Sequence, residues 1–220
     1  MENNILKELS KFDTATLSDA LDGIGYNGGL IGIKPQNLNN NITGIAYPIK
    51  YRNVSKIEFE LKNPANFIDD VPLNHIPILD NNGRIDCTVW GDILTEVAMK
   101  RGIQGVIING CCRDIASINK HQFNLFSKDV FMQSGKGRTC IKNINTKIKI
   151  NNVEIRPGDY IRGDENGVVV IPQEKIKTII RYSKIITTKE DLIKKMVKKD
   201  SRLDEIRKNV NYSHAWEELK

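Results

Sequence analysis

The segment that decides the fold spans residues 90–114 and reads WGDILTEVAMKRGIQGVIINGCCRD. Residues 93–101 place their apolar side chains at helical spacing, and Gly102 follows as a typical helix stop. The β-branched run at 106–108 lies between glycines, which is typical of a buried strand. We therefore predict a helix, a tight turn and a strand that ends at the pair Arg113-Asp114.

Two features of this segment favour the binding of an anion. Gly91 and Asp92 open the helix, where free N–H groups and the positive end of the helix dipole bind carboxylates or phosphates. Arg113 follows the carboxyl end of the strand, where open α/β sheets bind ligands, and its planar guanidinium suits a carboxylate. Asp114 offers oxygen ligands for Mg²⁺ or Mn²⁺. The alternative interpretation is an ordinary helix start with an Arg-Asp pair at the surface. The order of the elements makes this alternative weaker but does not exclude it.

At these residues the sequence resembles the RraA-like family. The resemblance rests on Gly91-Asp92 and on Arg113-Asp114, with twenty residues between Asp92 and Arg113. Similar phrases occur elsewhere in the chain, at 16–21, 44–46, 157–159 and 164–172. The family includes divalent-metal pyruvate aldolases that act on 4-hydroxy-4-methyl-2-oxoglutarate and 4-carboxy-4-hydroxy-2-oxoadipate. It also includes the regulator of ribonuclease activity A.

The resemblance implies an α/β fold with a central mixed β-sheet flanked by helices. This is an α/β/α sandwich of the swivelling β/β/α type with a C-terminal helix. We expect one domain over residues 1–220, with N-terminal helices in 1–25 and a C-terminal helical region in 173–220. The resemblance further implies a homotrimer, or a hexamer built from two trimers, with sites at the subunit interfaces.

Periodicity and turn residues predict the remaining elements. Helices are expected at 4–12 and 16–23, the second capped by Thr16 or Ser18, with Asp19 as a first-turn dipole partner. A short helix or turn is expected at 116–120. Strands are expected at 42–50, 76–79, 123–126, 147–150, 153–155 and 168–171. Residues 53–70 give no clear pattern, and residues 133–138 are expected to form a glycine-broken loop that does not bind phosphate.

The expected site consists of the helix start and the Arg-Asp pair. The backbone amides of Gly91, Asp92, Ile93 and Leu94 are expected to bind the substrate together with Arg113. Asp114 is expected to hold the divalent cation directly. The chemistry is stabilisation of the enolate that forms when the C3–C4 bond of a 2-oxo acid breaks. Asp92 is expected to act in proton transfer through a water molecule and to lie in the outer shell of the metal.

The resemblance implies roles for two further residues, and the sequence departs from the family pattern at one position. It implies that Glu190, in the C-terminal helix, reaches the outer metal shell of an adjacent subunit; a solvated glutamate is an equally good interpretation. It also places the segment around Asp19 near a neighbouring subunit's site. Many relatives carry an acidic residue three positions after the Arg-Asp aspartate, where this chain has Ser117. We expect this change to affect the substrate preference.

Composition argues against several other classes of protein. The net charge is +6, but the lysines are scattered and no aromatic-interleaved basic stripe occurs, so nucleic-acid binding is not expected. No apolar run approaches a membrane span and the N-terminus lacks a secretory pattern, so we expect a cytoplasmic protein. The four cysteines lack CxxC spacing, and Cys111-Cys112 are expected to be small buried side chains that fill a tight turn. The three histidines are isolated and are expected to be structural.

Three functions remain for this sequence. The first is a metal-dependent lyase that cleaves 4-hydroxy-2-oxo acids by an aldolase reaction and decarboxylates oxaloacetate through the same pyruvate enolate. The alternative is a non-catalytic protein that binds a ribonuclease, which requires neither Asp92 nor Asp114. A methyltransferase is disfavoured because no glycine-rich strand-loop-helix for S-adenosylmethionine occurs. We expect the lyase, because both carboxylates are present.

Overall fold

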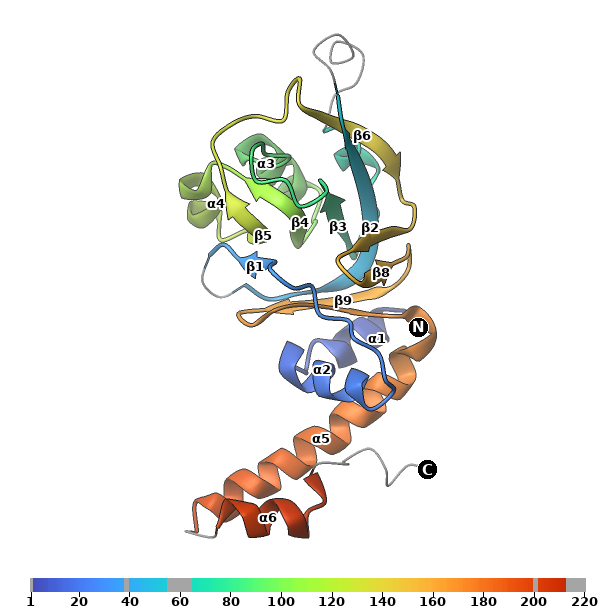
Figure 1. The fold of residues 1–220 in the computed structure, drawn as a ribbon, viewed down its shortest axis with the longest axis vertical. Helices are drawn as coiled ribbons and strands as arrows, with labels where there is room; N and C mark the ends of the chain where they lie inside the picture. Colours follow the sequence, from blue (N-terminus) through green and yellow to red (C-terminus); the bar gives the residue numbers. More distant parts are fainter. Residues whose placement is uncertain (1, 38–39, 55–64, 200–201, 213–220) are drawn as a thin grey trace.

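The computed structural model describes residues 2–37, 40–54, 65–199 and 202–212. Its centre is an eight-stranded mixed sheet of order β1-β5-β4-β3-β2-β9-β10, with β6 paired to β2 (Figure 1). The strands are β1 (Lys34–Pro35), β2 (Ile42–Asn53), β3 (His75–Asp80), β4 (Gly105–Cys112), β5 (Asn124–Val130), β6 (Thr139–Ile144), β9 (Tyr160–Asp164) and β10 (Gly167–Ile171). A separate hairpin is formed by β7 (Ile148–Ile150) and β8 (Val153–Ile155).

Helices cover this sheet on two sides (Figure 1). They are α1 (Glu2–Leu9), α2 (Thr14–Asp22), α3 (Asp92–Lys100), α4 (Ile115–His121), α5 (Ile176–Val197) and α6 (Leu203–Asn209), with short 3-10 turns at Ile68–Asp70 and Gln173–Lys175. One apolar core lies between α3, α4 and the parallel strands, and a second joins α1, α2 and α5 to β9 and β10. The sheet is nearly closed around a third core, to which the β7-β8 hairpin contributes.

The direction of the strands determines where the ends of the sheet lie. Strands β2, β3, β4 and β5 are parallel, and every other pairing between the named strands is antiparallel. The carboxyl ends of the four parallel strands therefore meet at one edge, and their amino ends meet at the opposite edge. The predicted α/β fold with a mixed sheet and a C-terminal helix is confirmed. No helix among the described residues is long and apolar enough to cross a membrane.

The predicted elements are present, with shifted boundaries and three omissions. The helix expected at 4–12 is Glu2–Leu9, the strand expected at 106–108 continues to Cys112, and the hairpin around Asn151 is as predicted. Strands β1, β6 and β9 were not predicted. Strand β9 contains Arg162 and Asp164, which are charged but buried. The Arg162 guanidinium donates hydrogen bonds to the carbonyls of Phe12, Ile42 and Gly163, so its buried donors are satisfied by contacts that no local pattern reveals.

The N-terminal cap of α2 differs from the prediction. The cap is Asp13, whose side chain accepts a hydrogen bond of 2.7 Å from the Thr16 amide, and neither Thr16 nor Ser18 caps the helix. The expectation that Asp19 is a first-turn dipole partner is wrong, because α2 begins at Thr14 and its first turn holds no acidic residue. Thr14 instead connects the helix to the sheet. Its amide and hydroxyl each donate a 2.7 Å hydrogen bond to the carboxylate of Asp164.

Asp164→Asn is expected to lower the free energy of unfolding by roughly 1–3 kcal/mol at neutral pH, because an amide group replaces a carboxylate oxygen that buried donors require. Burial by itself raises the pKa of Asp164, but the hydrogen bonds from Thr14 and Asn166 outweigh it and the net pKa is lowered. The stabilisation is therefore complete above the unfolded-state pKa of about 3.9 and is lost as the pH falls through the folded-state pKa.

Thermal unfolding of both proteins as a function of pH measures this effect. The gap in melting temperature should be present at pH 7 and should close below about pH 4. Asp22→Asn is the matched control, because Asp22 is an exposed residue of the same helix and its side chain makes no hydrogen bond to a described residue. Equal melting temperatures for wild type and Asp164→Asn at pH 7 would contradict the prediction.

Candidate active site

The helix start and the strand end predicted to form the site lie side by side. Strand β4 ends at Cys112, and the Arg113 amide donates a 3.0 Å hydrogen bond to the carbonyl of Trp90. Gly91 follows as the N-cap of α3. The buried Trp90 ring fixes this position, because its Nε1 donates to the Thr95 hydroxyl at 2.9 Å. The chain segment before α3 is thus held against the last residues of β4.

Asp114 turns back toward the start of α3. Its backbone is left-handed, with φ 61° and ψ 37°, where aspartate and asparagine are favoured among non-glycine residues. In this conformation its Oδ2 accepts a 3.1 Å hydrogen bond from the Asp92 amide and lies 3.3 Å from Nε of Arg113. The Asp114 carboxylate therefore accepts a hydrogen bond from one of the N–H groups at the helix start. The predicted pair is brought together with the helix start.

Not all the amides expected to bind substrate are free. The Asp92 amide donates to Asp114, and the Ile93 amide donates to Oδ1 of Asp92 at 2.8 Å. The amides of Gly91 and Leu94 form no hydrogen bond with a described residue. Helical spacing predicts that Ile93 packs on the apolar side of the helix, but its side chain is 73% exposed. The buried residues of α3 are Thr95 and Ala98. Ile93 therefore borders the site instead of the core.

Glycine is required at position 91 because side-chain atoms of Asp114 and Arg113 approach its Cα closely. A Cβ atom at this position would lie 2.4 Å from Oδ2 of Asp114 and 3.3 Å from Nε of Arg113. Real Cβ atoms essentially never come within 3.0 Å of another heavy atom. The absence of a side chain at Gly91 thus lets the Asp114 carboxylate reach the helix start.

A cavity of about 270 Å³ opens beside these groups. Its described lining comprises Ala65, Thr88, Val89, Trp90, Gly91, Asp92, Ile93, Leu94, Arg113, Ser134, Gly135 and Lys136. The third segment, 134–136, was predicted as a loop but not as part of the site. The Thr88 amide donates to the Gln133 carbonyl at 2.9 Å, and a Cβ at Gly135 would lie 2.5 Å from the Thr88 carbonyl oxygen. Gly135 is the one sequence signal for this close packing.

Only the Nε side of the Arg113 guanidinium contacts a charged group of the described chain. Its Nε faces Asp114, while its two terminal nitrogens form no hydrogen bond or ion pair with a described residue. The side chain is 38% exposed and lines the cavity. Because a guanidinium presents paired N–H groups in one plane, the terminal nitrogens can donate two parallel bonds to a carboxylate or an enolate oxygen.

The donor set at Asp114 fits a hydrated divalent cation but not a closed metal cage. No group of three or more histidine, cysteine or acidic side chains that could hold a metal occurs in the described part of the chain. Oδ1 of Asp114 accepts no hydrogen bond from a described residue. Mg²⁺ commonly binds one or two carboxylates and completes its octahedron with water and substrate oxygens, so Asp114 with Asp92 beside it suits that ion.

The cysteines are unsuitable as metal ligands or nucleophiles. All four are free and buried. Burial raises the pKa of Cys111 and of Cys112 to about 11, so both remain thiols at neutral pH. Their interpretation as small buried side chains is confirmed, although they lie in β4 instead of a turn. His75 hydrogen-bonds the Leu73 carbonyl, whereas His214 lies outside the described residues.

Glu190 does not approach the Arg-Asp pair within one chain. It lies on α5, which extends away from the sheet on the side opposite α3 (Figure 1). Its carboxylate accepts a 2.9 Å hydrogen bond from the Tyr212 hydroxyl and lies 3.7 Å from the Lys194 ammonium. Burial, and then the negative charge of Glu190, raise the pKa of Asp19. A role for Glu190 at an adjacent subunit stays a prediction.

A nearly closed mixed sheet flanked by helices, with an Arg-Asp pair beside a helix start, defines the α/β architecture of this chain. The family model described as RraA-like, Aldolase/RraA, matches residues 14–170. The chain therefore belongs to the RraA-like family.

Individual relatives extend this result. Protein DlpA of Legionella pneumophila is 39% identical over 213 residues, which are 97% of this chain and 35% of that protein, so the chain spans about a third of that relative's length. A protein of Halalkalibacterium halodurans named "Putative 4-hydroxy-4-methyl-2-oxoglutarate aldolase" is 31% identical over 190 residues, 83% of each chain.

Solved structures show the same fold. An uncharacterized protein from Pseudomonas syringae pv. tomato is 37% identical, with a TM-score of 0.85 over 93% of this chain and 97% of that chain. RraAS2 of Streptomyces coelicolor, titled an unusual member of the RNase ES inhibitor RraA protein family, has a TM-score of 0.79 at 18% identity. It covers 88% of this chain and 98% of that chain, and at this identity it establishes the fold alone.

Proposed function

We propose that the chain is a divalent-metal-dependent lyase that cleaves the C3–C4 bond of a 4-hydroxy-2-oxo acid and decarboxylates oxaloacetate. The observation that carries the proposal is the convergence of Arg113, Asp114 and the start of α3 on one cavity. The name of the Halalkalibacterium relative supports the same reaction class. An enolate-forming reaction needs cationic and hydrogen-bonding groups where charge develops, and this cavity provides both.

Arg113 binds the substrate in this proposal. Its free terminal nitrogens donate to the C1 carboxylate and the C2 oxygen of the 2-oxo acid. In the aldol cleavage the C4 hydroxyl loses its proton, the C3–C4 bond breaks, and the electron pair moves to the C2 oxygen as an enolate. Protonation at C3 then releases pyruvate. The hydrogen bonds from Arg113 strengthen as the C2 oxygen becomes negative, so they stabilise the transition state more than the substrate.

Asp114 and Asp92 have separate tasks. Asp114 holds the divalent cation through the oxygen that the Asp92 amide does not occupy. When bound there, Mg²⁺ or Mn²⁺ supplies Lewis-acid stabilisation of negative charge on the substrate oxygens. Asp92 lines the same cavity and keeps one carboxylate oxygen free of protein hydrogen bonds within the described chain. In this proposal that oxygen orients the water that exchanges a proton with the substrate.

Assays of pyruvate release test the proposal directly. The purified chain is incubated with 4-hydroxy-4-methyl-2-oxoglutarate, and separately with oxaloacetate, in the presence of Mg²⁺ or of excess EDTA. We expect pyruvate from both substrates with Mg²⁺, loss of turnover in EDTA, and recovery when Mg²⁺ is restored in excess. Failure to release pyruvate above the uncatalysed rate from either substrate would refute the proposed reaction. Full turnover in EDTA would refute the role of the metal.

Gly91→Ala is expected to reduce turnover roughly 100-fold, because the new methyl group displaces the Asp114 carboxylate by a substantial fraction of an ångström. Steady-state kinetics with oxaloacetate measures the effect. Gly29→Ala is the matched control, since a Cβ there would make only an ordinary 3.7 Å contact with the Asn27 side chain. Wild-type turnover in Gly91→Ala would show that the close approach of Asp114 to α3 is not needed.

A further inference from the structure

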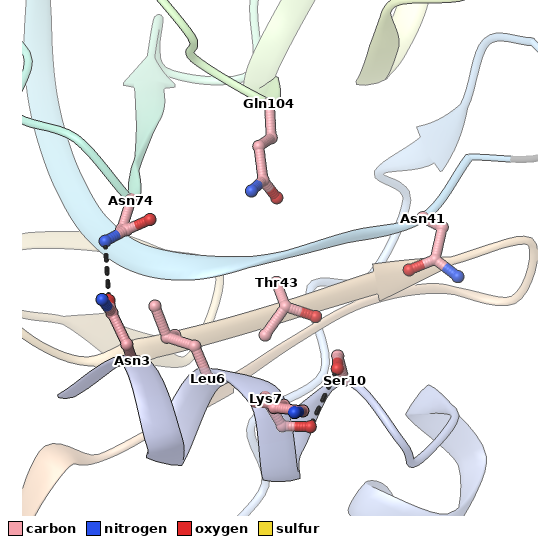
Figure 2. Close-up of a pocket in the computed structure, with 8 residues that line it drawn as sticks. All are labelled: Asn3, Leu6, Lys7, Ser10, Asn41, Thr43, Asn74 and Gln104. Atoms are coloured by element: carbon pink, nitrogen blue, oxygen red, sulfur yellow. Dashed lines mark hydrogen bonds between the residues drawn. The ribbon is translucent and has the colours of Figure 1, made fainter. Parts of the chain in front are cut away.

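A second polar cavity lies at the edge of the sheet opposite Arg113. Asn41, Asn74 and Gln104 each immediately precede a parallel strand, β2, β3 and β4 respectively, so they meet at the amino edge of the sheet. Helix α1 and Ser10, which directly follows it, lie across this edge (Figure 2). Arg113 follows the other end of β4, nine residues from Gln104. At about 3.3 Å per residue, the two sites are roughly 25–30 Å apart.

Helix α1 completes the cavity with one face. Asn3, Leu6, Lys7 and Ser10 recur at the spacing that places side chains on the same side of a helix. Together with Asn41, Thr43, Asn74 and Gln104 they line a volume of about 350 Å³. Figure 2 shows the side chains from α1 and from the strand ends facing one another across this space. The volume is within the range of small-molecule sites.

The lining has an unusual chemical composition. It contains four carboxamides, two hydroxyls, one ammonium and one leucine, and no carboxylate occurs among these described residues. A carboxamide both donates and accepts hydrogen bonds, which suits the hydroxyl groups of a ligand. The ammonium of Lys7 adds a positive charge that no described acidic residue pairs with, which suits a single anionic group. The absence of a carboxylate in the lining argues against a metal ion.

Several of these groups are held in place but keep hydrogen-bonding capacity. The Asn74 side-chain amide donates to Oδ1 of Asn3 at 3.1 Å, which leaves Oδ1 of Asn74 and Nδ2 of Asn3 available (Figure 2). Oδ1 of Asn41 accepts from the buried Arg162 at 2.9 Å, which leaves its Nδ2 available. These bonds assign the orientation of three carboxamides. Three of the four carboxamides therefore present donors and acceptors in fixed positions.

Thr43 provides an independent observation. It is 9% exposed, and its hydroxyl oxygen is buried without a hydrogen-bond partner in the described structure. The residue lies on β2 at the floor of the cavity, between Asn74 and Asn41 (Figure 2). A buried hydroxyl normally has a partner, so an unpartnered one in a polar cavity calls for a group from outside the chain. Rotation of the Thr43 side chain would turn this hydroxyl, whose oxygen has less than 1 Å² of exposed surface as it stands, toward a hydroxyl group of a bound ligand.

We propose that this cavity is a binding site for a small hydroxylated anion, with its carboxylate or phosphate at Lys7 and its hydroxyl groups at the carboxamides and Thr43. The site is separate from the cavity at Arg113, and ligand bound there does not contact Arg113 or Asp114. A sugar acid and a sugar phosphate share this chemistry. They differ in the size and charge of the anionic group that meets the ammonium.

Isothermal titration calorimetry of the full chain tests the proposal with four probes. These are gluconate, glucose 6-phosphate, glucose, which lacks the charge, and inorganic phosphate, which lacks the hydroxyl groups. We expect gluconate or glucose 6-phosphate to bind with a Kd of about 1 mM or tighter, and the other two to bind at least about tenfold more weakly. Whichever of gluconate and glucose 6-phosphate has the lower Kd identifies the anionic group as a carboxylate or a phosphate. Absence of binding by both at about 10 mM would overturn the proposal.

Two substitutions locate the bound probe. Lys7→Gln removes the ammonium, and Asn74→Asp places a carboxylate in the cavity while keeping a residue type that tolerates the φ of 64° at that position. Each should raise the Kd at least about tenfold. Lys177→Gln and Asn145→Asp are the matched controls, because Lys177 is exposed outside the cavity and Asn145 is an exposed residue with φ 51°. The controls should bind as the wild type does.

The same titrations separate this site from the proposed active site. Binding of the probe should be unchanged in Arg113→Lys, whether or not the chain proves to be a lyase. Wild-type affinity in both Lys7→Gln and Asn74→Asp would overturn the proposal, because the probe would then be bound elsewhere. Loss of probe binding in Arg113→Lys would overturn it as well, since the probe would then occupy the cavity at Arg113.

Discussion

Arg113→Lys is expected to reduce the turnover of oxaloacetate roughly 100-fold while the chain stays folded. Lysine keeps the positive charge, but it cannot donate two parallel hydrogen bonds from one plane. It also cannot use Nε to face Asp114 while its terminal groups face the cavity, as Arg113 does. Because these contacts strengthen as the C2 oxygen becomes negative, the loss should appear in kcat as well as in KM.

Steady-state kinetics and thermal unfolding on one preparation of Arg113→Lys measure both quantities. Arg101→Lys is the matched control, since Arg101 follows the far end of α3 and pairs with Asp69 at the surface. It should retain wild-type turnover. A purely structural Arg113 predicts a lower melting temperature with full activity for each folded molecule, and that result would contradict the catalytic role.

Asp114→Asn is expected to have the largest effect, a loss of turnover on the order of 1,000-fold with little change in folding. Asparagine tolerates the left-handed backbone at this position, and its carbonyl oxygen can still accept the hydrogen bond from the Asp92 amide. The substitution therefore removes the negative charge and one oxygen ligand but preserves the local geometry. The loss reports on cation binding more than on the shape of the cavity.

The affinity for Mn²⁺, followed by electron paramagnetic resonance, gives a readout that is independent of turnover. Wild type should bind Mn²⁺, and Asp114→Asn should bind it at least about tenfold more weakly. Asp69→Asn, an exposed member of the surface pair with Arg101, should behave as wild type in both measurements. Wild-type decarboxylation by Asp114→Asn would show that Asp114 does not hold the metal.

The local pattern of residues 90–114 was sufficient to predict the helix, the strand and the position of the Arg-Asp pair. Helical spacing and a β-branched run report on which side chains are buried, and these signals act over a few residues. The order of helix, turn and strand then places the pair at the carboxyl edge of a parallel sheet. The resemblance to the RraA-like family rested on the same short motifs, which the family match confirms.

Other features depend on contacts between residues far apart in the chain. Asp164 binds Thr14 across 150 positions, and this contact, with the Asp13 cap, decides where α2 begins. The sequence does not predict strand β9, because Arg162 and Asp164 have the polarity of surface residues. The fold nevertheless buries both side chains and provides hydrogen-bond partners for each. No periodicity records such pairing, because it requires two segments to be already in contact.

The cavities are the clearest products of the tertiary structure. Segment 134–136 carries no catalytic motif, yet the packing of Gly135 on Thr88 makes it a wall of the site. The carboxamide cavity joins α1 to three strand ends whose asparagines and glutamine look individually like ordinary loop residues. The sequence by itself determined which short segments form strands and helices and which residues carry reactive groups. The tertiary structure decided which of those groups face the same space, because that depends on strand order and on packing between distant segments.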